Sequence, residues 1–397
     1  MFEPILAKPE RLIIGIMSGC SADGVDAAIV RVRGKGEALS WRLVRHETLQ
    51  YSPKVRDMIL GCSESGSGDV TTLCRINVLL GELFARAITH ITQKAGIDLK
   101  AVDLIGSHGQ TVQHLPESVT LTGIPVRSSL QIGEPTVIAE RTGITTIANF
   151  RARDLAAGGE GGPLEAYVDY LLFHHRSRGR IALNIGGVTN LTAIPASAGA
   201  DGVVGFDTGP GNMILDGLVA QITGGRESFD HDGRYGRRGV IRPDVLARLL
   251  THSYLEKPPP KTCGRDEFGR SFLNNLTKRY GTLSNDDLIA TMTRFTAESI
   301  ASACRQHVMP NNVYEEAIVS GGGALNSFLM EQLRSALPEL TITSSEEYGL
   351  PVASKEAVAV AILANETIFG IPNNLPAATG ARHPVVLGSI VPAFNGR

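Results

Sequence analysis

The sequence has almost no excess of charge of either sign. Its 397 residues include 38 lysines and arginines against 40 aspartates and glutamates, which gives a formal net charge of −2. A chain this close to neutral has no electrostatic field that would collect nucleic acid or an anionic membrane. We therefore expect no nucleic acid and no membrane among its partners.

Cysteine is scarce, and the five that occur form no paired pattern. The absence of a C-x-x-C pair and of any Cys/His cluster excludes the usual structural zinc sites. An odd count leaves at least one thiol free, which is typical of a reduced, intracellular chain. We expect a cytoplasmic protein.

Long apolar runs are missing too. The best window, residues 357–364, is far shorter than the roughly 18 apolar residues of a membrane-spanning helix. Glu3, Lys8, Glu10 and Arg11 interrupt the first apolar stretch. It therefore lacks the apolar core of a secretory signal.

Neither common nucleotide-binding fingerprint is present. No G-x-x-x-x-G-K-[ST] occurs, and the GEGGPL string that begins at Gly159 has Leu164 where G-x-G-x-x-G needs its last glycine. These two absences argue against a P-loop nucleotidase and against a Rossmann dehydrogenase.

Glycine, by contrast, is abundant. The chain has 44, where an average usage of about 7% would give roughly 28. Four glycine-bearing loops follow predicted strands, at residues 18–26, 184–190, 206–212 and 320–326. Such loops turn at positive φ and bring N–H groups close to an anion, so they can cradle phosphate. Four in one chain favour nucleotide binding over a role as turns alone.

The elements predicted from residue patterns repeat in two halves. Strands are expected at residues 12–17, 25–32, 41–51 and 101–105, with a helix at 71–95. After 144–150 the pattern restarts, with a strand, glycine turn and strand over 181–194, strands at 202–206 and 316–319, and a helix at 327–337. This repetition predicts two α/β domains with a cleft between them.

Several polar residues at strand ends are candidates for chemistry. Asp207 follows a predicted strand and is either a general base or the cap of the next turn. His108 is interpreted as a hydrogen-bonded turn residue, with Gln110 and Thr111 as polar contacts of a substrate. Asp23 is a candidate for holding Mg²⁺ through water.

Arg153 belongs to the charged segment NFRARD beside the glycines of 158–162. It is either part of a solvated face or a guanidinium offered to a carboxylate or phosphate. Glu356 begins an apolar helix, where the helix dipole alone explains an acid.

Taken in order, the motifs resemble those of the anhydro-N-acetylmuramic acid kinase family. This family lies in the sugar kinase/Hsp70/actin superfamily and is related to levoglucosan kinase. The matching strings lie between residues 12 and 388: GIMSGCSADGVD, IGSHGQTV, RTGITTIANFRARDLAAGGEGGPL, LNIGGVTNLT, GFDTGPGNMILD, FDHDGRYGRRG, PPKTCGRDEF, SGGGALN and EEYGLPVASKEAVAVA. The resemblance implies an α/β protein with two ribonuclease H-like (actin-like ATPase) domains and an interdomain cleft. We expect the domains to cover residues 1–148 and 149–397.

The resemblance also implies a double reaction with ATP and Mg²⁺. Water opens the 1,6-anhydro ring of 1,6-anhydro-N-acetylmuramic acid at the anomeric carbon, and the freed 6-oxygen takes the γ-phosphoryl group. The products are N-acetylmuramic acid 6-phosphate and ADP, as in peptidoglycan recycling. The predicted enzyme is thus a phosphotransferase with an alcohol acceptor.

Site residues carry over position by position. Asp207 would be the base that deprotonates water, and Thr111, Arg153 and Glu356 would bind the sugar or lie near it. The nucleotide-binding residues implied by the resemblance are Gly19, Cys20, Ser21, Ala22, Asp23, Gly24, Val25, Asp26, Gly186, Gly187, Asn190, Gly321, Gly322 and Gly323.

Two other functions stay open from the sequence. Asp169 stands where the muramic acid kinases tend to have His and matches the levoglucosan kinases, which points to a neutral anhydrosugar. Cys20 in place of Thr and Asn149 in place of Asp point to a nucleotide-binding regulator without catalysis. Arg153 favours the muramic substrate, because a guanidinium matches its lactyl carboxylate. A homodimer is one candidate oligomeric state.

Overall fold

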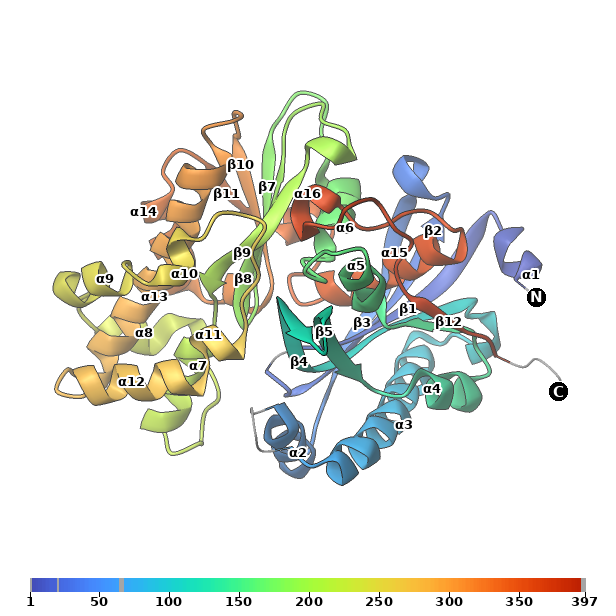
Figure 1. Ribbon diagram of the computed structural model, residues 1–397, viewed down its shortest axis with the longest axis horizontal. Coiled ribbons are helices and arrows are strands. Elements are labelled where there is room, and N and C mark those ends of the chain that lie inside the picture. Colours follow the sequence, from blue (N-terminus) through green and yellow to red (C-terminus); the bar gives the residue numbers. More distant parts are fainter. Residues whose placement is uncertain (1, 20, 64–67, 394–397) are drawn as a thin grey trace. The chain divides into compact units, whose positions relative to one another are not determined.

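The structure is a computed structural model that describes residues 2–19, 21–63 and 68–393 (Figure 1). The chain divides into two compact units. Unit 1 comprises Met1–Leu171 and Ser354–Arg397, and unit 2 comprises Leu172–Ala353. Each unit contains one mixed β-sheet and helices, so the predicted α/β class is confirmed.

The sheet of unit 1 has the strand order β12-β6-β4-β1-β2-β3, and β5 pairs with β4. β1 is antiparallel to β2, β2 is antiparallel to β3, and β4 and β6 continue the sheet in parallel. The strands are β1 (Glu10–Ser18), β2 (Gly24–Arg33), β3 (Ser40–Gln50), β4 (Leu104–Leu121), β5 (Ile124–Ile132), β6 (Thr146–Ala148) and β12 (Ser389–Val391).

Helices cover both faces of this sheet. Alternate residues of β1 point to opposite faces, so neighbouring residues of this strand contact different helices. Ile14 and Ile16 of β1 pack in one cluster with apolar residues of α3 (Val70–Ala95). Gly15, between them, faces α15 (Lys355–Ile368), and a Cβ there would lie 1.8 Å from the backbone oxygen of Ala357. The other helices of unit 1 are α1 (Glu3–Leu6), α2 (Pro53–Ser63), α4 (Pro135–Thr142), α5 (Phe150–Ala156), α6 (Glu165–Phe173), which ends in unit 2, and α16 (Pro376–Thr379).

The sheet of unit 2 repeats this topology with the order β11-β10-β7-β8-β9. Its first three strands are antiparallel neighbours, and β10 and β11 continue in parallel beside β7. The strands are β7 (Arg180–Ile185), β8 (Val188–Ile194), β9 (Val204–Pro210), β10 (Glu316–Ser320) and β11 (Thr341–Ser344). Both units therefore have the ribonuclease H-like order, in which the first strand lies between the second and the fourth.

The helix α13 (Asn285–Ala303) connects two apolar cores in unit 2. Ala297 and Ile300 pack against the sheet, whereas Leu288 and Phe295 pack among the helices that follow β9. Those helices are α7 (Met213–Ile222), α8 (Arg234–Arg238), α9 (Pro243–Leu249), α10 (Ser253–Glu256), α11 (Arg265–Phe268) and α12 (Arg270–Tyr280), and α14 (Ser327–Ala336) follows β10. Short 3-10 or π turns lie at Gly36–Ala38, Leu99–Ala101, Ala200–Gly202, His231–Gly233, Cys304–Val308, Gly322–Leu325 and Ser345–Tyr348.

The compact units differ from the predicted division after residue 148. Residues 149–171 and 354–397 group with unit 1. The physical reason is that α15 packs on β1, β2 and β4, and that β12 pairs with β6. The C-terminal part of the chain thus completes the sheet with which the chain begins.

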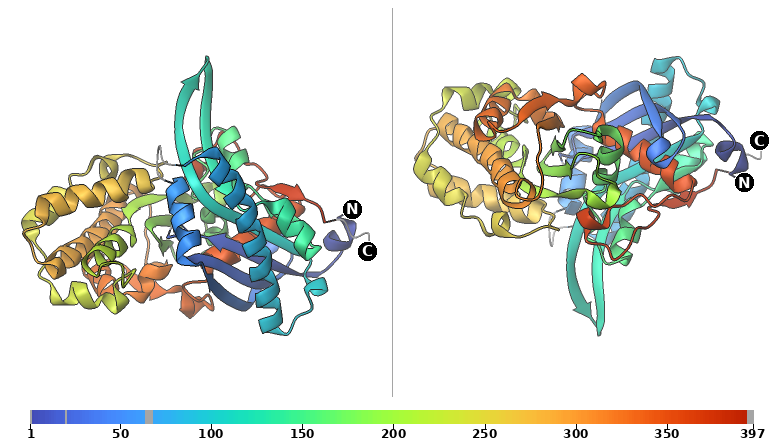
Figure 2. Two further views of the ribbon diagram at one scale, coloured as in Figure 1. Left: turned by 90° about the horizontal axis from the view of Figure 1, so that it is seen from below. Right: turned by 90° about the horizontal axis from the view of Figure 1, so that it is seen from above.

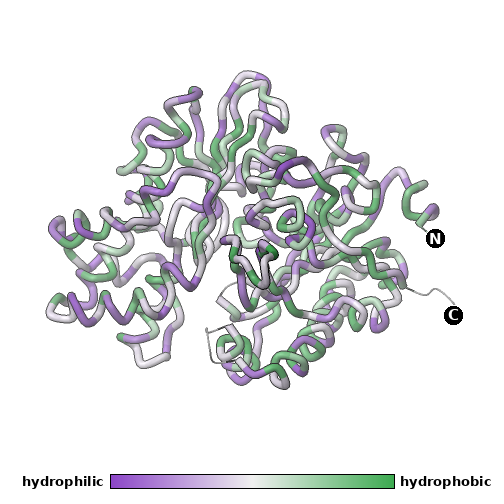
Figure 3. The backbone as a smooth tube through the Cα atoms, in the orientation of Figure 1, coloured by the Kyte–Doolittle hydropathy of each residue, from purple (hydrophilic) through white to green (hydrophobic). Residues whose placement is uncertain are grey.

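One part of unit 1 was not anticipated. β4 continues to Leu121 and forms with β5 a hairpin that stands away from the sheet (Figure 2). Apolar residues otherwise concentrate in the strands and helix faces of the two cores (Figure 3), whereas Leu121 and Ile124 near the hairpin tip are exposed. Within the described ranges, no helix is long and apolar enough to cross a membrane.

Candidate active site

Three glycine loops of unit 2 meet at one end of its sheet. Gly186 and Gly187 form the tight turn between β7 and β8. The loop after β9 packs directly on this turn, because the N–H groups of Gly211 and Asn212 donate to the oxygens of Gly187 (3.0 Å) and Gly186 (2.8 Å). A Cβ at Gly211 would lie 2.3 Å from the Gly186 oxygen, so only glycine permits this contact.

The third loop, residues 321–323, follows β10 and reaches the same place. A Cβ at Gly323 would lie 2.3 Å from Cγ2 of Ile185, the last residue of β7. Gly321 has a φ of 81°, which favours glycine. Parallel β7 and β10 end side by side here. The structure thus brings together Gly186, Gly187 and residues 321–323, which the sequence assigned to one nucleotide site.

The segment after the third loop is held by side chains that the sequence analysis did not explain. Asn326 caps α14, since its Oδ1 accepts from the N–H of Leu329 at 3.0 Å. Asp232 accepts from the N–H of Ser327 at 3.3 Å, and Arg237 pairs with Glu331 at 2.8 Å. The FDHDGRYGRRG motif therefore braces the start of α14.

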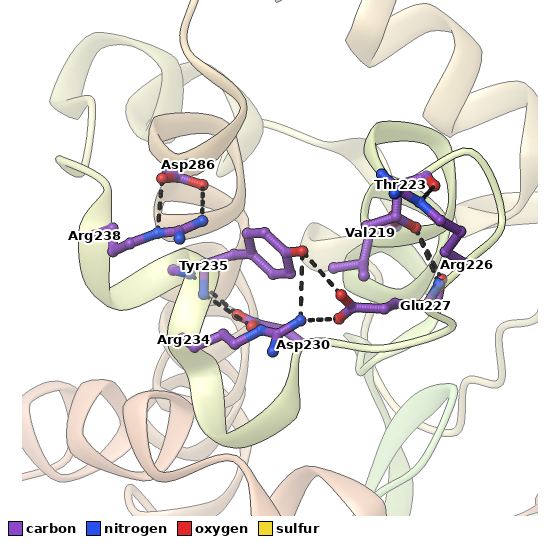
Figure 4. Close-up of polar contacts among 10 residues, drawn as sticks. Val219, Thr223, Arg226, Glu227, Asp230, Arg234, Tyr235, Arg238 and Asp286 are labelled. Atoms are coloured by element: carbon purple, nitrogen blue, oxygen red, sulfur yellow. Dashed lines mark hydrogen bonds and ion pairs between the residues drawn. The ribbon is translucent and has the colours of Figure 1, made fainter.

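That motif has its own internal support (Figure 4). Asp230 is buried and accepts from the N–H groups of Tyr235 (2.9 Å) and Gly236 (3.1 Å), which fixes the start of α8. Glu227 pairs with Arg234 and accepts from the hydroxyl of Tyr235. These contacts assign the motif a structural role, which its sequence alone did not reveal.

Asp207 lies within β9 rather than in the turn after it, because the strand continues to Pro210. Its N–H donates to the oxygen of Lys261 (3.0 Å), its carbonyl accepts from the hydroxyl of Tyr254 (2.8 Å), and its Oδ2 accepts from the N–H of Cys263 (2.9 Å). The residue at the start of α7 is Asn212. Asp207 is therefore no helix cap, and its carboxylate is held in one orientation.

Asn190 of β8 is the direct cross-strand neighbour of Asp207. Residues opposite one another on antiparallel strands share a face of the sheet. The Oδ1 atom of Asn190 is buried and has no hydrogen-bond partner among the described residues. Unit 2 thus places a carboxylate and an unsatisfied amide oxygen side by side.

The first phosphate loop, predicted for residues 19–26, lies in unit 1. Gly19 accepts from the N–H of Ala22 at 3.1 Å, and Ala22 has a φ of 51°. Ser21 donates to the exposed carboxylate of Asp23 at 2.8 Å. This is a tight turn with polar groups at its tip, as a phosphate cradle requires. Cys20 lies outside the described residues.

The last residues of that prediction belong to β2. Gly24, Val25 and Asp26 pair with β3. Val25 packs in the core of unit 1, and the carboxylate of Asp26 accepts from the hydroxyl of Thr48. The turn itself, rather than these strand residues, presents groups to a ligand.

Gln110 of β4 has an internal role. Its amide is fully buried, accepts from Ser18 at 2.6 Å and donates to the oxygen of Gly19 at 3.2 Å. Gln110 therefore holds Ser18 and Gly19 at the start of the first loop, and its amide is used in these contacts instead of being offered to a substrate. Thr111, the next residue, is half-buried, and its hydroxyl accepts from Gln131 at 3.2 Å.

His108 is hydrogen-bonded, but it lies within β4 and not in the turn that the sequence predicted, because the strand continues to Leu121. It is buried, with Nδ1 against the oxygen of Gly109 (3.1 Å) and Nε2 accepting from Arg151 (3.1 Å). Burial, reinforced by the charge of Arg151, lowers the pKa of His108 to about 3. The ring is neutral at physiological pH.

Two charged residues of α5, Asp154 and Arg153, have different environments. Asp154 is fully buried and accepts from Gly161, Asn374 and Thr379 at 2.7 to 2.8 Å, so it is structural. Arg153 is exposed, and its guanidinium makes no hydrogen bond or ion pair with the described residues. Arg153 is the residue of this segment that can bind a ligand anion.

The start of α15 contains a buried charge cluster beside Glu356, which is half-buried. Lys355 lies 2.8 Å from Asp169 and 3.3 Å from Glu165, and all three belong to unit 1. Burial raises the pKa of Glu165, and neighbouring Asp169 adds to this effect. The spacing of these residues along the chain gave no signal of the cluster.

Asp23 is the candidate residue for holding a magnesium ion. No group of three or more His, Cys, Asp or Glu among the described residues is arranged to hold a metal. An exposed carboxylate next to a hydroxyl at the tip of a tight turn nevertheless suits Mg²⁺, which keeps most of its waters and binds through phosphates. The residues fit a water-bridged ion.

Comparison with known proteins agrees with this geometry. The family model described as "Anhydro-N-acetylmuramic acid kinase" matches residues 11–393. The anhydro-N-acetylmuramic acid kinase of Caldanaerobacter subterraneus subsp. tengcongensis is 45% identical over 388 residues, which cover 97% of this chain and 98% of that protein. Its namesake from Bacillus cereus strain G9842 is 40% identical over 95% of this chain and 98% of that protein, and the one from Salinibacter ruber is 40% identical over 96% of each. The chain belongs to the anhydro-N-acetylmuramic acid kinase family.

Proposed function

We propose that the chain opens the 1,6-anhydro ring of 1,6-anhydro-N-acetylmuramic acid with water and phosphorylates the 6-oxygen with ATP. The products are N-acetylmuramic acid 6-phosphate and ADP, which places the reaction in peptidoglycan recycling and amino-sugar metabolism. The observation that carries this proposal is the oriented carboxylate of Asp207 in the sheet whose glycine loops meet at one end. Family membership over almost the whole chain supports it.

In this proposal Asp207 takes a proton from the attacking water. Its carboxylate is nearly buried, and the N–H of Cys263 fixes Oδ2. Opening the acetal develops positive charge at the anomeric carbon, and a fixed carboxylate both orients the water and stabilises that charge. Asn190 offers its unsatisfied Oδ1 beside the same carboxylate.

The glycine loops bind the nucleotide in this proposal. Phosphoryl transfer needs positioning and charge neutralisation more than covalent chemistry. Backbone N–H groups of Gly187, Gly322 and Gly323 supply both, as does the turn at residues 19–23. Gly186 and Gly321 shape their loops, since their N–H groups donate to the oxygens of Val188 (3.1 Å) and Val352 (2.9 Å). A bound Mg²⁺ would neutralise charge on the phosphates, and Asp23 would hold it through water.

Arg153 selects the substrate. Its exposed guanidinium has no internal partner among the described residues, and the muramic sugar carries a lactyl carboxylate that it can bind. Arg153→Ser should lower kcat/KM for the muramic sugar by about 10-fold or more, since a charged hydrogen bond contributes about 1.5–3 kcal/mol. Use of levoglucosan by the same variant should be unaffected. Equal losses on both sugars would remove this role from Arg153.

Asp207→Asn tests the proposed function directly. Loss of the base should lower kcat by about 100-fold to 10,000-fold while ATP binding, measured by calorimetry, stays near the wild-type value. Asp201→Asn is the matched control, because Asp201 is an exposed acid of the same unit. Unchanged turnover in Asp207→Asn would contradict the proposal, and ATP binding without turnover of any anhydrosugar by the wild type would favour a regulator.

Localisation and assembly are proposed on the sequence alone. We place the enzyme in the cytoplasm, where its scattered cysteines stay reduced, with neither nucleic acid nor membrane as partner. A homodimer is the oligomeric state that we would test first, by sedimentation equilibrium.

A further inference from the structure

The motif PPKTCGRDEF contains a lysine that the proposed mechanism does not use. Lys261 is only 4% exposed, although lysine is almost never fully buried without a partner. Its Nζ donates to the backbone oxygens of Tyr254 and Leu255, both at 3.3 Å. These oxygens belong to the short helix α10, where a cation near the C-terminal end interacts favourably with the carbonyls.

Two aromatic rings complete the surroundings of the ammonium. Nζ lies 4.9 Å from the ring centre of Tyr254 and 5.7 Å from that of Phe206, the residue before Asp207. Both distances allow a cation–π interaction. The ammonium is therefore packed against the strand that carries Asp207.

The same residues form a closed ring of contacts around Asp207. Lys261 Nζ binds the oxygen of Tyr254, the Tyr254 hydroxyl binds the oxygen of Asp207, and the N–H of Asp207 binds the oxygen of Lys261. Two residues further along, the N–H of Cys263 holds Oδ2 of the carboxylate. We call residues 261–263 the strap.

We propose that Lys261 is a positioning residue for Asp207, whose ammonium ties the strap to α10 and β9 and so keeps the carboxylate in its reactive orientation. Lys261 acts through the strap and through Tyr254. Neither the family match nor the names of the relatives assign this residue a role, and the inference rests on the proposed function of Asp207 as the base. Small misplacements of a catalytic group can cost about 100-fold in rate.

The charge of Lys261 makes this positioning sensitive to pH. Burial lowers the pKa of Lys261 to about 8, against the attraction of the Asp207 carboxylate. The other groups that face it are Lys257 at the end of α10 and His307 of the turn Cys304–Val308. Burial raises the pKa of Cys263 well above its usual value, and burial together with Lys261 lowers the pKa of His307, so both stay neutral between pH 7 and 9. Loss of the Lys261 charge above pH 8 should then loosen the strap.

The experiment compares Lys261→Met and Lys261→Arg with the wild type in Mg-ATP and 1,6-anhydro-N-acetylmuramic acid from pH 6 to 10. Lys261→Met should lower kcat by about 10-fold to 100-fold with the KM for ATP unchanged. The wild-type kcat should fall as the pH rises through about 8. Lys261→Arg should restore most of the rate and remove that decline, since arginine stays charged. Lys278→Met, at an exposed lysine of α12 in the same unit, is the matched control with unchanged kcat.

Hydrogen exchange of the strap, read by mass spectrometry, decides the inference without turnover. Lys261→Met should exchange faster than the wild type in peptides that cover residues 254–263, and Lys261→Arg should not. Unchanged exchange, or an unchanged kcat in Lys261→Met with the wild-type pH profile, would overturn the role of Lys261. A wild type that phosphorylates no anhydrosugar while exchange responds as expected would instead overturn the proposed function. If Lys261→Met does not fold, an unchanged pH profile in Lys261→Arg overturns the inference by itself.

Discussion

Asn190 on β8 lies directly opposite Asp207 on β9, at the point where the register of the two strands shifts. Their side chains share one face of the sheet of unit 2. The family resemblance implied that Asn190 binds the nucleotide. The pairing places it beside the proposed base, where its buried Oδ1 has no partner in the described chain.

Asn190→Asp should move the acid limb of the kcat profile to higher pH. The substitution sets a second carboxylate about 5 Å from Asp207, measured between Cβ atoms of directly opposed residues. Two facing carboxylates hold a proton more readily than one, so the base is ionised only at higher pH. Steady-state rates between pH 4 and 8 measure the shift.

Asn190→Ala is the control for that variant. It removes the amide without adding charge, so it should lower kcat while the position of the acid limb stays as in the wild type. An identical shift in both variants would mean that loss of the amide, and not the added charge, moves the acid limb of the kcat profile. No shift in Asn190→Asp would mean that the two side chains are independent.

Gly186→Ala should weaken ATP binding without unfolding the protein. The added methyl meets no heavy atom closer than the Val188 oxygen at 3.6 Å, an ordinary contact. It would, however, stand between the turn and a phosphate that approaches the backbone. We expect the KM for ATP to rise by about 10-fold, or 1.4 kcal/mol, with an unchanged melting temperature.

Gly211→Ala gives the contrasting result, because its Cβ would meet the Gly186 oxygen at 2.3 Å. This variant should lose stability as well as ATP binding. If Gly186→Ala leaves the KM for ATP unchanged, the turn between β7 and β8 does not contact phosphate.

Much of the fold could be predicted because its signals are local. Helical spacing of apolar residues gave α3 and α14 almost to their ends, and the glycine turn between two apolar runs gave the β7–β8 hairpin. The glycine loops of unit 2 were recognised because each needs bare backbone at a strand end. These signals require no knowledge of distant contacts.

The interior of the site could not be predicted, because it depends on contacts between distant residues. The predicted strand at residues 12–17 contains Gly15, but nothing in its sequence shows that α15 packs against this glycine. Lys261 and Asp207 are brought together by strand pairing and a strap, which no spacing in the sequence encodes. Gln110 looked like a substrate contact only because its buried partners, Ser18 and Gly19, are 92 and 91 residues away.

Gly15→Ala should destabilise unit 1 strongly. A Cβ at Gly15 would lie 1.8 Å from the Ala357 oxygen, so α15 would have to move away from the sheet. Overpacking a core typically costs about 1–3 kcal/mol, and backbone contact puts this variant at the upper end. Gly61→Ala is the control, since Gly61 lies in α2 with no heavy atom of the described residues within 4 Å of a Cβ placed there, and it should gain about 0.5–1 kcal/mol. Urea unfolding of both variants measures the difference, and equal stabilities would contradict the close packing of α15 on β1.

Glu165→Gln should stabilise the protein at neutral pH. Burial and the neighbouring Asp169 raise the pKa of Glu165 above its ordinary value of 4.5, so the folded state binds its proton more tightly than the unfolded state. The contribution of Glu165 to stability must therefore fall as the pH rises above 4.5. Glutamine does not titrate and removes this loss. The advantage of the variant should be absent near pH 4, should grow above that pH, and should level off once Glu165 is ionised in the folded state as well.

Removing Lys355, the cationic partner of Glu165 and Asp169, should have the opposite effect on stability. Burial opposes its charge, but Asp169 and Glu165 outweigh burial and raise the pKa of Lys355. Lys355→Met removes the ammonium that pairs with buried Asp169 and half-buried Glu165, which should cost about 3–5 kcal/mol at pH 7. Glu140→Gln, at an exposed glutamate of α4, controls for loss of a surface charge. Because 1 kcal/mol shifts the melting temperature of a unit of this size by about 2–4 °C, calorimetry between pH 4 and 8 resolves both effects. A melting temperature of Glu165→Gln that follows the wild type at every pH would show that Glu165 carries no charge penalty in the fold.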